Sequence, residues 1–129
     1  MYGDVIGWKS KKQRYVTKAS TYAEYVALSE AVSELMSIRE IMKIFNVNLD
    51  DNPVQIYDDT SEVVSIAKHG NFTKNSKHIK VHYHYVHECL MENRINILKV
   101  STDENTADIF TKALCREKFE RFRSWMNVN

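Results

Sequence analysis

The spacing of apolar residues changes several times along the chain. This pattern restricts the possible folds more than any other feature of the sequence does. From Ser20 onwards apolar residues recur at helical spacing, which predicts one long helix of about 24 residues. The positions on its apolar stripe are Ala23, Ala27, Ala31, Leu35, Ile38, Ile41, Met42 and Phe45. Residues 54–57 and 95–100 read instead as short strands. Strands separated by helices predict an α/β fold in which segments 54–58 and 95–100 pair in parallel.

Turn and cap residues predict the remaining elements. Thr60 or Ser61 can cap a short helix that ends at His69–Gly70. Segment 79–91 has helical periodicity, and segments 106–114 and 117–126 are expected to be closing helices. Residues 5–8 follow a turn signal and are expected to form a short strand, with 15–17 as its candidate continuation. At 129 residues, the chain is expected to form one domain over 1–129.

Charge and cysteine content limit the expected environment. A net charge of +1 gives no electrostatic argument for strong nonspecific nucleic-acid binding, so any such binding needs a local patch. No apolar stretch approaches the roughly 20 residues that cross a bilayer, and the first residues do not read as a signal peptide. We therefore expect an intracellular protein, cytoplasmic or nuclear, without a membrane partner. Cys89 and Cys115 are expected to be reduced thiols that pack in the core.

Four carboxylates fall at positions where a metal site can form. Asp58 and Asp59 follow a predicted parallel strand, at the sheet end where ligand crevices of α/β proteins usually open. Glu24 and Asp108 stand near the starts of two predicted helices. Converging carboxylates bind hard cations such as Mg²⁺, and two such ions can support phosphodiester hydrolysis. The alternative is that the helix-start acids only complement helix dipoles and the strand-end acids only form a turn.

Several runs resemble the ribonuclease H domain of copia-type LTR retrotransposons, the C-terminal part of their Pol polyprotein. Residues 7–13 and 20–28 resemble the family patterns SWSSKKQ and SSTEAEYIAL, and residues 56–64 resemble IYCDNQSAI. Residues 76–88 are similar to TKHIDIRYHFIRE, and residues 106–120 closely match LADIFTKALPRPKFE. The resemblance covers essentially the whole chain in order.

This resemblance implies a ribonuclease H-like fold, a mixed sheet flanked by helices. It also implies hydrolysis of the RNA strand of RNA–DNA hybrids with Mg²⁺ or Mn²⁺ held by four acids. Matched position by position, Glu24, Asp59 and Asp108 are the expected catalytic metal ligands, and Asp58 is a neighbour. The family's Asn-Gln after the central acid is Thr60-Ser61 here.

The family's first acid lies on a strand that precedes the segments matched here, and the 129 residues contain no counterpart to it or to the first two strands. In the two-metal scheme that acid bridges both ions, so the chain on its own is expected to be catalytically deficient. The competing expectation is a remnant or host-retained fragment that binds nucleic acid or protein without catalysis. Without those strands, segment 54–58 exposes an edge, and the isolated chain is expected to be marginally stable, aggregation-prone or paired with a partner strand.

Basic and histidine side chains are the expected nucleic-acid contacts. Lys74, Lys77, His78 and His84 are assigned to the phosphate backbone of the hybrid, although basic loops are also often merely solvated. His78 and His82 have the spacing of zinc ligands on a helix, but no cysteine or acid completes such a site. The expected partners are an RNA–DNA hybrid and, in a full-length element, the reverse transcriptase portion of the same polyprotein. The stripe of Phe119, Phe122 and Trp125 is expected to be core packing.

Overall fold

The computed structural model describes residues 4–13, 20–49, 51–70 and 79–128. It divides into two compact units, one formed by Tyr15–Val100 and the other by Met1–Arg14 with Ser101–Asn129. Each unit is described by itself below. The prediction of one domain over 1–129 stays a prediction.

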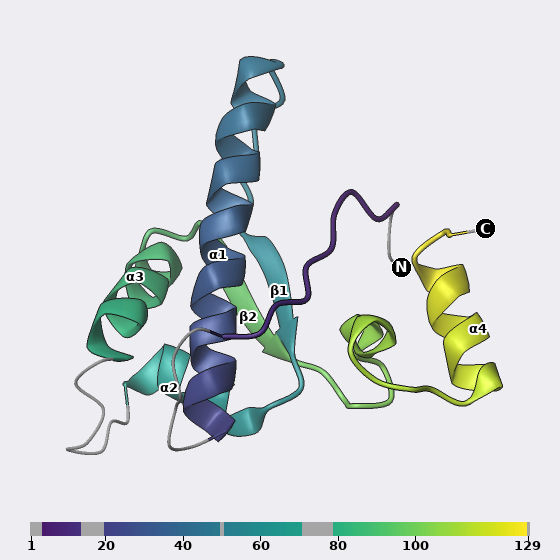
Figure 1. Ribbon diagram of the computed structural model, residues 1–129. Coiled ribbons are helices and arrows are strands. Elements are labelled where there is room, and N and C mark those ends of the chain that lie inside the picture. Colours follow the sequence, from purple (N-terminus) through teal and green to yellow (C-terminus); the bar gives the residue numbers. More distant parts are fainter. Residues whose placement is uncertain (1–3, 14–19, 50, 71–78, 129) are drawn as a thin grey trace. The chain divides into compact units, whose positions relative to one another are not determined.

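Among its described residues, the larger unit contains two strands and three helices. Its elements are α1 (Ser20–Ile44), β1 (Val54–Asp58), α2 (Ser61–His69), α3 (Lys80–Met91) and β2 (Ile95–Lys99). The strands pair in parallel, with Val54 opposite Ile95 and Asp58 opposite Lys99. Helices α2 and α3 pack against β2, and α1 packs against α2 and α3 (Figure 1). The predicted α/β class and parallel pairing are therefore confirmed.

Local signals explain why these elements begin and end where they do. Thr60 occupies the predicted N-cap of α2 with extended backbone, but its side chain forms no capping hydrogen bond. Gly70 ends the helix in the left-handed conformation, with its N–H donating to the carbonyl of Ile66. In β1 and β2, Ile56 and Ile97 face the helices because side chains alternate along a strand. The buried residues of the core cluster are Tyr25, Leu28, Val32, Val63, Ile66, Ala67, Ile79, Val86, Cys89, Ile95 and Ile97.

The buried face of α1 differs from the predicted stripe. Tyr25, Leu28 and Val32 are buried, whereas Ala27 and Ala31 are exposed. Both stripes have helical spacing, and packing the larger side chains removes more apolar surface from water than packing alanines does. At the other end of the helix, Ile41, Ile44 and Phe45 are exposed because the last turns of α1 extend beyond the sheet (Figure 1).

The smaller unit contains the 3₁₀ helix η2 (Thr106–Phe110) and α4 (Arg116–Trp125). The helix predicted over 106–114 is therefore wrong in type and length, and the one predicted over 117–126 is confirmed within a residue at each end. Phe122 is fully buried, whereas Phe119 is exposed, so the predicted core stripe holds only in part. Cys115 is also exposed, in contrast to the buried Cys89, so the packing role predicted for Cys115 is wrong.

The strand predicted at residues 5–8 is wrong, since residues 4–13 have no regular secondary structure. Among the described residues the sheet consists of β1 and β2 alone, so this segment has no neighbouring strand to provide ladder hydrogen bonds. The ring of Trp8 instead stacks on that of Phe110, with 5.2 Å between centroids. The possible continuation at 15–17 lies outside the described residues, and the mixed ribonuclease H-like sheet stays a prediction.

Candidate catalytic centre

The turn after β1 meets the beginning of α1 in the larger unit. The hydroxyl of Thr60 donates a hydrogen bond to Oε2 of Glu24. The backbone N–H of the same threonine donates to Oδ1 of Asp58 at 2.8 Å. Thr60 therefore bridges a carboxylate from the strand end and a carboxylate from the helix. Glu24 is the fifth residue of α1 and lies just beyond its first turn, so its placement depends on this contact more than on the helix dipole.

Asp58 is the carboxylate whose protonation this arrangement perturbs. Burial raises the pKa of Asp58 above its ordinary value of 3.8, and the hydrogen bond from the Thr60 N–H opposes that rise. The negative charges of Glu24 and Asp59 raise the pKa further, while the Lys99 ammonium lowers it. The strand end thus concentrates negative charge, which a cation would relieve.

Asp59 follows β1 and is half-buried. Its backbone carbonyl accepts a hydrogen bond from Nζ of Lys99, the last residue of β2. This contact ties the ends of the two strands together at the position where the sequence predicts a metal ligand. The sequence did not predict that Thr60 and Lys99 contact the acids of this site, nor did it predict the orientation of Asp58. The alternation of Val54, Ile56 and Asp58 along β1 is the signal that could have placed Asp58 on the helix-facing side.

Asp108 lies in η2 of the smaller unit and is 5% exposed. Its Oδ1 forms an ion pair with Nζ of Lys112 at 2.9 Å, whereas its Oδ2 is buried without a hydrogen-bond partner among the described residues. Asn105 caps η2 by accepting a hydrogen bond from the N–H of Ala107 at 3.2 Å, which fixes the turn that carries the acid. A buried carboxylate oxygen without a partner is costly unless another group binds it.

These side chains fit a hard divalent cation by their donor chemistry. All are carboxylates, and the unpartnered Oδ2 of Asp108 is an oxygen of the kind that Mg²⁺ or Mn²⁺ binds. Within the described residues, however, no group of three or more histidine, cysteine, aspartate or glutamate side chains is arranged to hold a metal ion. The structure thus joins Glu24 to the end of β1, and it describes Asp108 only within its own unit.

The predicted nucleic-acid contacts are placed in part. Lys74, Lys77 and His78 lie outside the described residues. His84 is exposed on α3, where its ring meets the edge of Tyr83 at 5.5 Å between centroids. Exposure is compatible with a substrate contact. The His78–His82 zinc pair cannot be compared with the structure, although Nδ1 of His82 lies 3.1 Å from Oγ of the buried Ser29.

Comparison with known proteins finds relatives that are all retrovirus-related Pol polyproteins of plant transposons. The retrovirus-related Pol polyprotein from transposon TNT 1-94 of Nicotiana tabacum is 33% identical over 118 residues, which is 92% of this chain and 9% of that protein. Those from transposons RE1 and RE2 of Arabidopsis thaliana are 32% and 33% identical over 123 residues, which is 95% of this chain and 8% of each. The chain thus spans less than a tenth of their length.

No protein-family profile matches the chain. No solved structure matches it. Among the helices of the described residues, none is long and apolar enough to cross a bilayer.

Proposed function

Because this chain belongs to the Pol polyproteins of copia-type retrotransposons, we propose that it is their ribonuclease H segment, with a ribonuclease H-like fold. The proposed activity is hydrolysis of the RNA strand of RNA–DNA hybrids during reverse transcription. Two lines support it. The matched acids occur in the family's order, and Thr60 joins Glu24 to the end of β1.

In this proposal Mg²⁺ or Mn²⁺ is held by Glu24, Asp59 and Asp108. When bound, such ions supply an activated water and stabilise the leaving oxygen of a phosphodiester. The residues themselves do the positioning: Thr60 orients the Glu24 carboxylate, and Lys99 holds the backbone of Asp59 at the strand end. Asp58 stays a neighbour, since its Oδ1 already accepts the Thr60 N–H.

The substrate contacts and the polyprotein partner belong to the same proposal. His84, which is exposed on α3, is proposed to contact a phosphate of the hybrid, together with Lys74, Lys77 and His78. Recognition would depend on backbone shape and 2′-hydroxyl groups rather than base edges. The reverse transcriptase portion of the same polyprotein is the proposed partner, and the proposed location is the cytoplasm or nucleus.

A second candidate function is a non-catalytic module that binds nucleic acid or protein. The observation that favours it is the incomplete acid set: the 129 residues supply three of the family's four acids. For the 129 residues tested alone, this candidate predicts hybrid binding without cleavage.

A hybrid-cleavage assay separates the two candidates. The 129-residue chain is compared, with Mg²⁺ and with Mn²⁺, with the same chain extended by the acid-bearing upstream segment of a relative. We expect cleavage by the extended chain only, and loss of that cleavage in its Asp59→Asn and Asp108→Asn variants. Asp103→Asn, a change at an exposed carboxylate of the same unit as Asp108, is the control that should keep the activity. Failure of the extended chain to cleave any hybrid would count against the ribonuclease proposal.

Strong cleavage by the short chain itself, lost in Asp59→Asn, would instead contradict the proposed deficiency of the 129 residues. Cleavage that is unaffected by Asp59→Asn would point to a contaminating nuclease. Binding is measured in parallel with the same hybrid in the absence of divalent cations, so that a chain that binds but does not cleave is recognised.

A further inference from the structure

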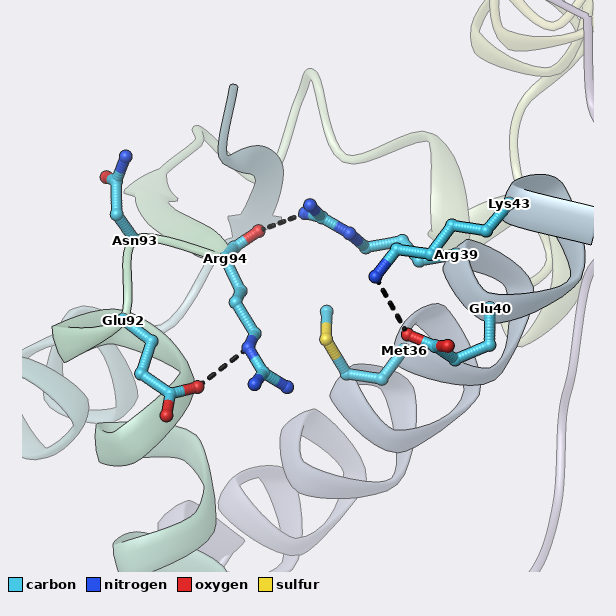
Figure 2. Close-up of a pocket in the computed structure, with 7 residues that line it drawn as sticks. All are labelled: Met36, Arg39, Glu40, Lys43, Glu92, Asn93 and Arg94. Atoms are coloured by element: carbon cyan, nitrogen blue, oxygen red, sulfur yellow. Dashed lines mark hydrogen bonds and ion pairs between the residues drawn. The ribbon is translucent and has the colours of Figure 1, made fainter. Parts of the chain in front are cut away.

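A polar pocket lies at the end of the sheet opposite the candidate catalytic centre. It has a volume of about 330 Å³ and is formed by the last turns of α1 and the turn between α3 and β2 (Figure 2). Its lining residues are Met36, Arg39, Glu40, Lys43, Glu92, Asn93 and Arg94. Arg94 directly precedes β2, whereas Asp58 ends β1 opposite Lys99, so about five residue steps, or ~16 Å of strand, separate the two sites.

The wall of this pocket is fixed by a buried charged side chain. Arg39 is only 4% exposed, and its guanidinium donates to the carbonyl of Arg94 at 2.8 Å and to that of Leu49 at 2.6 Å. The carbonyl of Arg94 also accepts the N–H of Val54 at 3.0 Å. The backbone that carries Arg94 is therefore held from two sides.

Arg94 directs its guanidinium into the pocket. Figure 2 shows its side chain running from the start of β2 toward Met36 on α1. Its Nε pairs with Oε2 of Glu92 at 2.7 Å. Its two terminal nitrogens donate no hydrogen bond to any described residue. A guanidinium held at Nε with both terminal nitrogens open is a preorganised fork for an anion.

The acids of the pocket are held by exchangeable pairs. Glu40 forms an ion pair with Nζ of Lys43 at 3.2 Å. In this ion pair, and in the one between Glu92 and Arg94, every side chain is more than 40% exposed. Exposed ion pairs of this kind contribute little to stability, so a more highly charged anion can displace them. The lining carries three cations and two carboxylates, which leaves a positive balance.

We propose that this pocket is a binding site for a phosphate monoester dianion. The terminal nitrogens of Arg94 bind two phosphate oxygens. The ammonium of Lys43 leaves its ion pair with Glu40 and binds a third phosphate oxygen. The buried positive charge of Arg39 adds to the attraction. A dianion competes with the two glutamates better than a carboxylate does, because it carries more charge and more acceptor oxygens. The volume also accommodates the alcohol part of a small ester. This inference does not depend on the proposed ribonuclease activity.

The test is an NMR titration of the ¹⁵N-labelled full chain with inorganic phosphate at constant ionic strength. We expect saturable shifts of the amides around Asn93 and Arg94. In Arg94→Gln the dissociation constant should rise at least tenfold, and in Lys43→Gln about threefold. The matched control is Arg123→Gln, since Arg123 forms an equally short, equally exposed ion pair with Glu120 at 2.7 Å, and it should bind like the parent.

Shifts that do not saturate, or that are unchanged in both Arg94→Gln and Lys43→Gln, would overturn the proposal. Lys43 is exposed, so its variant keeps the test decisive if Arg94→Gln folds poorly. Two further probes distinguish the source of the phosphate: a short oligothymidylate with a 5′-phosphate and the same oligomer without it. Competition by the phosphorylated oligomer alone supports the monoester, whereas equal competition by both would show that the site binds backbone diesters and would contradict it.

Discussion

The hydroxyl of Thr60 donates a hydrogen bond to the carboxylate of Glu24, across 36 positions of sequence. The same residue uses its N–H to bind Asp58, so one threonine holds the two carboxylates that come from different elements. The family resemblance places an asparagine at this position, which can also donate from its side chain. Thr60 is therefore the first residue at which the proposed catalytic centre can be tested.

Thr60→Val removes the hydroxyl donor and keeps the shape of the side chain. In the chain extended by the upstream acid, we expect this change to lower hybrid cleavage or Mg²⁺ affinity by about 10–100-fold, as is common when a hydrogen-bond partner of a metal ligand is lost. Thr60→Ser keeps the donor and should retain most of the activity. The measurement is cleavage rate against Mg²⁺ concentration, and equal curves for Thr60→Val and the parent would show that the contact does not position Glu24.

Asp58→Asn should change the pH dependence of folding. Because burial raises the folded-state pKa of Asp58 above 3.8, the folded chain holds this proton more tightly than the unfolded chain does. The stability that Asp58 contributes is therefore complete below pH 3.8 and is lost as the pH rises through the folded-state pKa. Relative to the parent, Asp58→Asn should gain stability between about pH 4 and pH 7. Urea midpoints across this range measure the effect, and a difference that is constant with pH would contradict it.

Arg39→Met should destabilise the larger unit by about 2–4 kcal/mol, because it leaves the carbonyls of Leu49 and Arg94 without their charged donor. Arg39→Lys should recover only part of this loss, since one ammonium cannot reproduce the fork of the guanidinium. The control Arg123→Met breaks an exposed ion pair and should stay within about 0.5 kcal/mol. Chemical denaturation measures all three, and equal losses for Arg39→Met and Arg123→Met would refute the anchoring role.

Gly70→Ala should destabilise the chain by about 1–3 kcal/mol. Gly70 has a φ of +68°, and a Cβ there would lie 2.6 Å from the hydroxyl oxygen of Tyr83. The cost therefore combines left-handed backbone strain with a steric clash. Adding Tyr83→Phe to Gly70→Ala should recover part of the loss by removing that oxygen. Gly7→Ala, where a Cβ meets nothing within 4 Å, is the neutral control, and thermal midpoints compare the variants.

Tyr25→Phe should be neutral or should stabilise the chain by up to about 1 kcal/mol. The side chain is fully buried in the core, and its hydroxyl oxygen has no hydrogen-bond partner among the described residues. Deleting a buried polar atom without a partner removes its desolvation cost and keeps the packing of the ring. Urea denaturation checks this, and a loss of more than 1 kcal/mol would reveal a partner for the hydroxyl, such as a bound water.

Much of the larger unit could be predicted from its sequence. The bounds of α2 follow from Thr60 and Gly70, and the parallel pairing of 54–58 with 95–100 follows from the helices between them. The helix bounds depend on residues close together in sequence, and the parallel pairing depends on the order of strands and helices along the chain. The strand predicted at 5–8 failed because a strand needs a neighbouring strand, which the local pattern of apolar residues cannot supply.

For the candidate site, the sequence alone predicts the acids and their order, because motif matching is a local property. Only the tertiary structure decided that Asp58 and Glu24 share Thr60, and that one buried oxygen of Asp108 has no partner in the part of the chain that the structure describes. It likewise decided that α1 buries Tyr25, Leu28 and Val32 rather than its alanines. These outcomes depend on contacts between segments distant in sequence, where the area buried and the available hydrogen-bond partners select among patterns that are equally periodic.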